Sequence, residues 1–384
     1  MDLKKVKFSM LQIAYWCASG AFISYAASYF LNVRELSTSF VGTVMSLYTV
    51  AAFFGQFFWG YLCDRLGSNR KVVILSCILS AVLYAVVFFM ESPWLILVSY
   101  AALGFVMPCL VASIDTWILK VYADTPSAYG PIRASGSLGY AVFIFFYGSW
   151  LMQAGYSLML WVGIFFLGCV VLLCFFLPEG AAVQTRSHSS EGKVKIDKIW
   201  VLFFIFLFLS GIAAVPLSNM VAVLIENVNG TVVQQSYCLF ASALAQVPLM
   251  LLAVKLKRVS PILRMEVGAG CYCLALFMAG IASSPWVIVG AALIQGTGFG
   301  IVLPAMREYV FDGAPKGKET VMQGIADAIN TSLAGAAGSL MVGWLADAIG
   351  VSGAMYLCTG MQALGLFIGG YLVLSKRRAN RENA

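Results

Sequence analysis

Charged residues are scarce in this sequence. Asp, Glu, Lys and Arg make up 11% of the 384 residues, and there is a single histidine. A soluble domain carries about twice that charged fraction. Hydrophobic residues make up 61% of the chain, and the mean hydropathy is +0.89. Because this leaves too little polar surface to cover a water-facing globule, the composition excludes a soluble fold.

The residue patterns of common catalytic sites are also lacking. We find no His/Cys/Asp spacing typical of a metal site, no nucleophile paired with a base and no phosphate-binding loop. Most of the ten cysteines lie inside apolar runs, which favours packing over a disulfide scaffold. The glycines between Gly296 and Gly300 also lie in an apolar run, which predicts close helix packing. A membrane enzyme is therefore the least favoured class, and we expect no cofactor and no metal.

Long apolar runs are what the sequence has instead. Twelve can be read between charged residues and Gly or Pro breaks, each close to the roughly 20 residues that cross a hydrocarbon core about 30 Å thick. Helices are expected because every backbone amide in lipid must be satisfied within its own segment. The predicted fold is an all-α membrane protein with twelve transmembrane helices. The predicted spans are 8–31, 38–62, 71–90, 94–120, 129–152, 157–177, 199–225, 234–254, 263–283, 286–308, 320–343 and 354–375.

The basic residues predict the orientation of these helices. Alternate loops are rich in Lys and Arg, whereas the loops on the other side contain Arg34 alone. By the positive-inside rule, both termini and the basic loops are cytoplasmic. The net charge of +7 is thus mostly a signal of topology, and no nucleic-acid partner is expected. We predict a multi-pass protein of a prokaryotic plasma (inner) membrane.

A polar stretch after the sixth span divides the chain. It is rich in Ser, Gly and charge, as flexible linkers are. We predict a six-helix bundle at 1–178, a cytoplasmic linker at 179–198 and a second, pseudo-symmetric six-helix bundle at 199–384. Asp64-Arg65 follows the second span, and Lys257-Arg258 follows the eighth, 193 residues later. This spacing indicates an internal repeat, by which transporters build a site between two halves.

A motif follows the second span. It reads G-Y-L-C-D-R-L-G-S-N-R-K and resembles the signature G-x-L-x-D-R-x-G-x-x-R-[KR] of the major facilitator superfamily. In physical terms, Gly60 permits close helix approach, Gly67 permits a tight turn, and Asp64 can pair with a basic residue or a helix N-terminus. The resemblance implies a twelve-helix transporter in which this cytoplasmic gating motif breaks and re-forms its contacts as the two halves rock. The gating residues are Gly60, Asp64, Arg65, Gly67 and Arg70.

A narrower resemblance covers the fourth and fifth spans. Asp115 and Trp117 lie in the fourth, and Arg133 and Tyr140 lie in the fifth, within the stretch Y-G-P-I-R-A-S-G-S-L-G-Y. This pattern is similar to the lactose permease and its sugar, nucleoside and phenylpropionate relatives. The resemblance implies that Asp115 and Arg133 bind substrate and that Tyr140 stacks on a sugar ring.

Helix geometry independently indicates that these two charges can meet. Asp115 lies about five residues before the cytoplasmic end of its span, and Arg133 lies about five residues after the start of the next. At about 1.5 Å per residue, both are roughly 7–8 Å below the same surface. A charge at membrane depth costs several kcal/mol unless it is paired or hydrated, so each is a functional candidate. A purely structural ion pair remains the alternative.

The sequence departs from the lactose permease at the residues that couple protons there. That group uses a histidine and carboxylates on spans eight and ten, whereas here Gln295 lies near the histidine position and span eight offers no acid. Asp115 could bind a proton when Arg133 turns to the substrate, because a buried carboxylate that loses its cation is easier to protonate. Asp327, in the eleventh span, is the other candidate, although it also fits a helix-start carboxylate in a wet funnel.

These residues predict a secondary active importer that moves a small polar or amphipathic metabolite. The resemblance to the major facilitator superfamily implies that it works by H⁺ symport with alternating access. A saccharide or nucleoside is favoured because it suits a carboxylate–guanidinium pair beside a stacking ring. An aromatic carboxylate fits Arg133 almost as well. Besides Asp115 and Arg133, the substrate-binding candidates are Tyr140, Trp16 and Trp117, together with Asn219 and Gln295 from the opposite half.

Two other functions stay open. A proton-driven drug or metabolite exporter of the same fold would typically carry a Gly-Pro pair on span five, which this span lacks. A non-transporting receptor would call for a large signalling extension, and neither the short N-terminus nor the tail after Lys376 supplies one. We expect a monomer whose partners are its substrate and the bilayer.

Overall fold

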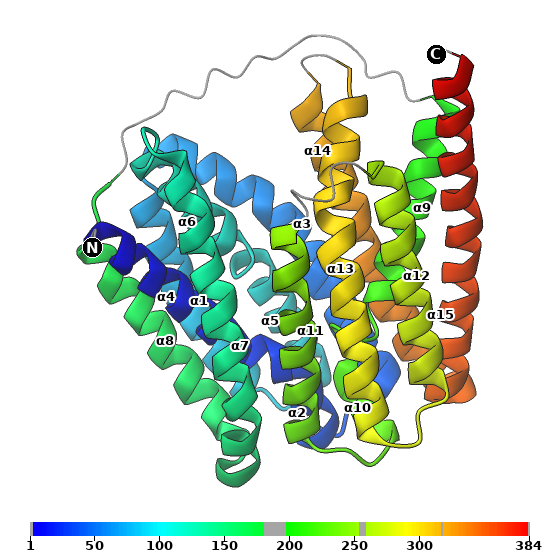
Figure 1. Cartoon of the computed structure of the whole chain (residues 1–384). Helices are drawn as coiled ribbons and strands as arrows, with labels where there is room; N and C mark the ends of the chain where they lie inside the picture. Colours follow the sequence, from blue (N-terminus) through cyan, green and yellow to red (C-terminus); the bar gives the residue numbers. More distant parts are fainter. Residues whose placement is uncertain (1–2, 180–196, 253–258, 316–317, 383–384) are drawn as a thin grey trace. The chain divides into compact units, whose positions relative to one another are not determined.

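A computed structural model describes residues 3–179, 197–252, 259–315 and 318–382, which form helices joined by short turns (Figure 1). The chain divides into two compact units, Met1–Arg186 and Ser187–Ala384. Most of the predicted linker, residues 180–196, lies outside the described residues. The predicted boundaries of the two bundles and the linker therefore stay predictions.

Unit 1 (Met1–Arg186) accounts for the first six predicted spans. The first span is interrupted by the 3-10 turn η1, and the fourth is interrupted at Met107 and Pro108, whereas the other four are single helices. The elements are α1 (Leu3–Phe22), η1 (Ile23–Tyr25), α2 (Ala26–Asn32), α3 (Thr38–Leu66), α4 (Asn69–Phe89), α5 (Pro93–Val106), α6 (Cys109–Val121), η2 (Pro126–Ala128), α7 (Tyr129–Ala154) and α8 (Ser157–Phe175).

Unit 2 (Ser187–Ala384) accounts for the other six spans. Its first span is interrupted by the turn from Val215 to Met220, and its fifth contains the π-helical segment η4. The last two spans meet at Gly350, where φ is 78° and the helical geometry breaks. The elements are α9 (Lys198–Ala214), α10 (Val221–Asn227), α11 (Val232–Leu252), α12 (Pro261–Gly280), α13 (Pro285–Gly313), α14 (Glu319–Asp327), η4 (Ala328–Leu333) and α15 (Ala334–Glu382).

The chain is an integral membrane protein. Seven of its described helical segments are long and apolar enough to cross a membrane by length and composition. The interrupted and more polar helices complete the set of twelve spans. The predicted all-α fold with twelve membrane helices is confirmed.

The first span of each unit is broken beyond its middle, since α1 has 20 residues before the break and α2 has 7 after it, and α9 has 17 and α10 has 7. In unit 1 the break is η1, and in unit 2 it is the turn that contains Pro216. Proline removes a helical hydrogen bond and so favours such a break. Interrupted helices at corresponding positions of two repeats are a pointer to a transporter's binding region.

Glycines bring the second and fourth spans of unit 1 into backbone contact. A Cβ added to Gly104 on α5 would lie within 3 Å of the backbone of Tyr48 on α3, and a Cβ on Gly55 of α3 would overlap the backbone of Phe105. These two helices can therefore pack this closely only where a side chain is absent.

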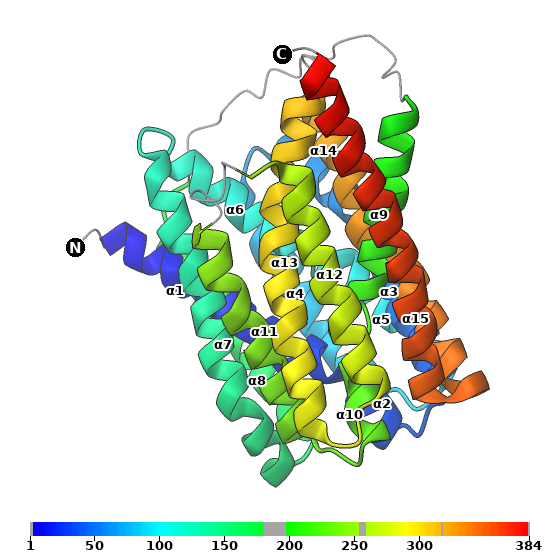
Figure 2. The ribbon, with the colours of Figure 1, turned by 45° about the vertical axis from the view of Figure 1, so that its right-hand side comes forward.

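The same contact recurs in unit 2. A Cβ added to Gly296 on α13 would overlap the backbone of Ser242 on α11, and Gly300 lies against the backbone of Gln246. Figures 1 and 2 show α11, α13 and α12 side by side. The close packing predicted for this glycine run is confirmed. Gly296 lies 192 residues after Gly104, one residue fewer than the 193 that separate Asp64 from Lys257.

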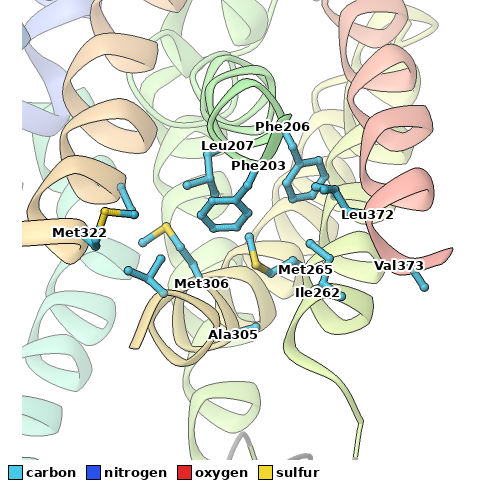
Figure 3. Packing of buried hydrophobic residues seen from close by; sticks show 13 residues of the cluster. Phe203, Phe206, Leu207, Ile262, Met265, Ala305, Met306, Met322, Leu372 and Val373 are labelled. Atoms are coloured by element: carbon cyan, nitrogen blue, oxygen red, sulfur yellow. The ribbon is translucent and has the colours of Figure 1, made fainter. Parts of the chain in front are cut away.

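Buried apolar side chains of unit 2 pack around α9 in one cluster. Phe203 and Phe206 are 0% exposed. The cluster draws its side chains from α9, α12, α13, α14 and α15, and Figure 3 shows Phe203 and Met265 near its centre. Close packing of this kind fixes the helices that carry the polar residues of the unit. The cluster comprises Phe203, Phe206, Leu207, Ile262, Met265, Ala269, Ala305, Met306, Val310, Met322, Ala326, Leu372 and Val373.

The α3–α5 contact gives a stability prediction. We expect Gly104→Ala to lower the free energy of unfolding by about 1–3 kcal/mol, since the new methyl group must push two backbones apart. Gly168→Ala on α8 is the matched control, because a Cβ there would meet none of the described residues within 4 Å. Thermal unfolding of the purified variants measures both. Equal melting temperatures for the two variants would contradict the packing described.

Candidate functional site

Two opposite charges meet between neighbouring helices of unit 1. Asp115 lies on α6 and Arg133 on α7, with 3.5 Å between Arg133 Nε and Asp115 Oδ2. The Arg133 side chain is 28% exposed and the Asp115 side chain 20%. The charges therefore lie together, as their predicted depths indicate, in a partly open site.

The Asp115 carboxylate has a shorter contact that the sequence did not reveal. Gln12 on α1 donates from Nε2 to Asp115 Oδ1 over 2.7 Å, although 103 residues separate the two. The Gln12 residue is 1% exposed, and the Tyr129 side chain also hydrogen-bonds to Asp115. A buried amide pointing at a carboxylate is a charge-assisted hydrogen bond, which is stronger than a neutral one. Gln12 is thus a member of the site.

Aromatic side chains cover the other side of the guanidinium. The Cζ of Arg133 lies 4.8 Å from the ring centre of Trp16, in the geometry of a cation–π contact. Trp16 in turn meets Tyr140 edge to face, with 6.1 Å between ring centres. The Tyr140 hydroxyl is 3.2 Å from Ser24 Oγ. The structure therefore brings Asp115, Arg133, Trp16 and Tyr140 into one cluster.

Glycines on α7 allow α1 to approach this closely. A Cβ at Gly136 would lie 2.7 Å from Trp16 Cδ1, and one at Gly139 would lie 2.8 Å from the Ile13 side chain. Because both glycines face α1, Gln12 and Trp16 can reach Asp115 and Arg133 on the neighbouring helices.

Trp117 does not join the cluster. It is 1% exposed, its Nε1 donates to the carbonyl of Pro178 over 2.9 Å, and its ring packs edge to face against Phe8. These contacts give it a packing role at the end of α6, and its predicted part in substrate binding stays a prediction.

The polar residues predicted in unit 2 fall in two places. Gln295 is 4% exposed, and its Oε1 accepts from Ser242 Oγ over 2.9 Å, while Gln246 Nε2 donates to the same Ser242 oxygen over 3.1 Å. These residues form a neutral polar chain between α11 and α13. Asn219 lies apart from them, exposed in the turn between α9 and α10. Its part in binding stays a prediction.

Asp327 lies at the end of α14, where the π-helical segment begins. Its carboxylate interacts electrostatically with Arg307 of α13. Gln323, one turn earlier on α14, donates to the backbone carbonyl of Arg307 over 2.5 Å. Asp327 is thus an acid with a basic neighbour on the adjacent span, and its predicted part in proton coupling stays a prediction.

The gating motif forms a capped turn in unit 1. Gly67 adopts the left-handed conformation with φ 60°, so the tight turn predicted for it is confirmed. Arg70 Nη2 donates to the carbonyl of Leu177 over 2.6 Å, which ties the motif to the end of α8. Asp64 and Arg65 are exposed, and the gating role of these residues stays a prediction.

Within the described residues of unit 1, no close helix approach occurs at Gly60. A Cβ added to Gly60 would meet none of these residues within 4 Å. The physical reason is that the backbone contact of α3 falls at Gly55, more than one turn earlier, where a Cβ would overlap the backbone of Phe105.

The ion pair gives a double-variant prediction. We expect Arg133→Ala to lower the free energy of unfolding by about 1–2 kcal/mol, because it leaves a half-buried carboxylate without its cation. Adding Asp115→Asn should recover part of that loss, because the amide carries no charge. Chemical or thermal unfolding measures the cycle. A double variant no more stable than Arg133→Ala would show that the two charges do not interact.

The sequence and fold resemble those of known transporters. A model of the MFS_1 like family matches residues 6–357. The uncharacterized transporter YwbF of Bacillus subtilis (strain 168) is 23% identical over 375 residues, covering 94% of this chain and 91% of its own. The maltose permease of Geobacillus stearothermophilus is 24% identical over 386 residues, covering 97% and 95%.

Solved structures show the same fold. A mutant form of the nucleoside transporter NupG superimposes with a TM-score of 0.85 at 16% identity, covering 96% of this chain and 99% of that one. A D-xylose-proton symporter gives a TM-score of 0.69 at 12% identity, covering 95% and 96%. The chain therefore belongs to the MFS_1 like family, and it is a transporter with the major facilitator fold rather than an enzyme.

Proposed function

We propose that this transporter imports a saccharide or a nucleoside by H⁺ symport and that Asp115 and Arg133 hold the substrate's polar groups. The observation that carries the proposal is the ion pair itself, two opposite charges 3.5 Å apart and partly exposed in a membrane helix pair. Ionisable groups at this depth are costly and mark substrate or ion pathways.

The chemistry of the cluster suits a polyhydroxylated ligand with an apolar face. The carboxylate accepts from hydroxyl groups and the guanidinium donates to oxygen atoms. The rings of Trp16 and Tyr140 lie beside the charges and can cover the flat face of a sugar or base. The maltose permease, the nucleoside transporter and the D-xylose-proton symporter found among similar proteins carry ligands of these classes by name.

The distances suggest how a proton could be coupled to binding. The contact from Arg133 to Asp115 is 3.5 Å, longer than the 2.7 Å hydrogen bond from Gln12. Arg133 can therefore turn to the substrate while Gln12 still holds the carboxylate in place. Once its cation is engaged elsewhere, the carboxylate binds a proton more readily. Asp327 beside Arg307 is the second candidate for the coupling acid.

The remaining parts of the proposal concern the setting of the protein. We place it in a prokaryotic inner membrane, with both termini cytoplasmic, because basic residues gather in alternate loops. It acts as a monomer by alternating access.

Ligand stabilisation tests the site. Purified protein is heated with maltose, xylose, uridine or 3-phenylpropionate, and the shift in melting temperature gives the affinity. We expect a sugar or the nucleoside to stabilise the protein, and Asp115→Asn and Arg133→Ala to weaken that binding about 10- to 100-fold, since each removes a charge-assisted contact. Asp312→Asn, an exposed carboxylate on α13, is the control. Wild-type affinity in both site variants would refute the assignment.

Uptake into proteoliposomes tests the coupling. We expect accumulation of the stabilising ligand only under an inwardly directed pH gradient. The coupling acid is Asp115 or Asp327, and we expect one of Asp115→Asn and Asp327→Asn to abolish coupling. In that variant, accumulation should fall to the level that the wild type reaches without a gradient, while exchange of internal for external ligand continues. Equal accumulation by the wild type with and without the gradient would show that transport is not coupled to protons.

A further inference from the structure

Two buried polar atoms in the site have no hydrogen-bond partner in the described part of the chain. They are the carbonyl oxygen Oε1 of Gln12 and the indole nitrogen Nε1 of Trp16. The two residues lie four positions apart on α1, so their side chains share one face of the helix. Buried polar groups are normally paired, and an unpaired one calls for an explanation.

The orientation of the Gln12 amide is fixed by its neighbour. Its NH₂ group donates to Asp115 over 2.7 Å, and an ionised carboxylate can only accept. The carbonyl oxygen must therefore point elsewhere, and it needs a donor.

Trp16 has the opposite requirement. Its indole N–H can only donate, and the guanidinium of Arg133, 4.8 Å from the ring centre, offers no acceptor. A Cβ at Gly136 would lie 3.2 Å from this nitrogen, so the glycine keeps a side chain away from it. The N–H therefore needs an acceptor that the neighbouring helix does not provide.

We propose that Gln12 Oε1 and Trp16 Nε1 form a subsite for substrate hydroxyl groups, beside the groups held by Asp115 and Arg133. A hydroxyl can both donate and accept, so one hydroxyl or two adjacent ones satisfy both atoms. The cluster is partly open, since the side chains of Arg133 and Asp115 are 28% and 20% exposed. This inference rests on the proposed function and narrows its substrate class.

The subsite decides between the ligand classes that the sequence leaves open. The carboxylate of an ionised aromatic acid can accept from Trp16 but has no proton to donate to Gln12. A saccharide or the ribose of a nucleoside supplies both. The subsite therefore selects hydroxyl-bearing ligands and disfavours aromatic carboxylates such as 3-phenylpropionate.

A thermodynamic cycle that combines protein variants with deoxy analogues of the ligand tests this subsite. The protein variant is Trp16→Phe, which removes the N–H and keeps an aromatic ring for Arg133. Trp150→Phe on α7, where the side chain is exposed, is the matched control. The ligands are maltose, xylose and uridine, each with its monodeoxy analogues, and the readout is affinity by isothermal titration. A second variant, Gln12→Met, removes the carbonyl acceptor.

We expect removal of one particular hydroxyl to weaken binding about tenfold in the wild type and in Trp150→Phe. In Trp16→Phe the same removal should cost little, because the hydrogen bond is already gone. Gln12→Met should likewise lose discrimination at that hydroxyl or at its neighbour. The effects of the protein variant and of the missing hydroxyl group would then not add. A tryptophan with only a structural role would give additive effects, because it makes no contact with that hydroxyl group.

Two outcomes would overturn the subsite. In the first outcome, a sugar or nucleoside binds and Arg133→Ala abolishes that binding, but each deoxy analogue loses affinity by the same factor in the wild type as in Trp16→Phe. The two atoms then hold only water, so the subsite is wrong and the proposed function still stands. If none of maltose, xylose and uridine binds, both the subsite and the proposed substrate class are wrong.

Discussion

The carboxylate of Asp115 and the guanidinium of Arg133 lie in helices whose other residues are mostly apolar. A lone charge there would cost several kcal/mol, so the surrounding structure must satisfy both. Gln12 and Tyr129 bind the carboxylate, and the Trp16 ring covers the guanidinium. The close packing of α1 against α7 at Gly136 follows from this need, because a larger residue there would displace the side chains that support the pair.

The two units share a backbone plan and differ in their polar groups. Each has an interrupted first span and a glycine contact between its second and fourth spans. In unit 1, the ion pair of Asp115 and Arg133 joins α6 and α7. In unit 2, α11 and α13 are joined by the neutral hydrogen-bonded chain from Gln246 through Ser242 to Gln295. A duplicated scaffold can thus carry unequal chemistry, since glycine contacts fix the helices and leave the other faces free to vary.

The membrane helices and the ion pair could be predicted from the sequence, because the bilayer strongly constrains which residues can lie within it. Apolar runs of spanning length gave the helices, and the equal depths of Asp115 and Arg133 indicated that they meet. Gln12 was missed because a single amide in an apolar run has no local pattern, and its partner is 103 residues away. Residue type also could not separate Trp16, beside Arg133, from Trp117, whose N–H is bound to Pro178. Tertiary packing alone decides between them.

We propose that the substrate binds at the ion pair between α6 and α7. An experimental structure of the protein with its stabilising sugar or nucleoside bound tests it most directly. We predict the ligand within hydrogen-bond distance of the Arg133 guanidinium and of Asp115, with a hydroxyl near Gln12 and Trp16. A ligand bound away from α1, α6 and α7, with the ion pair unchanged, would contradict the account.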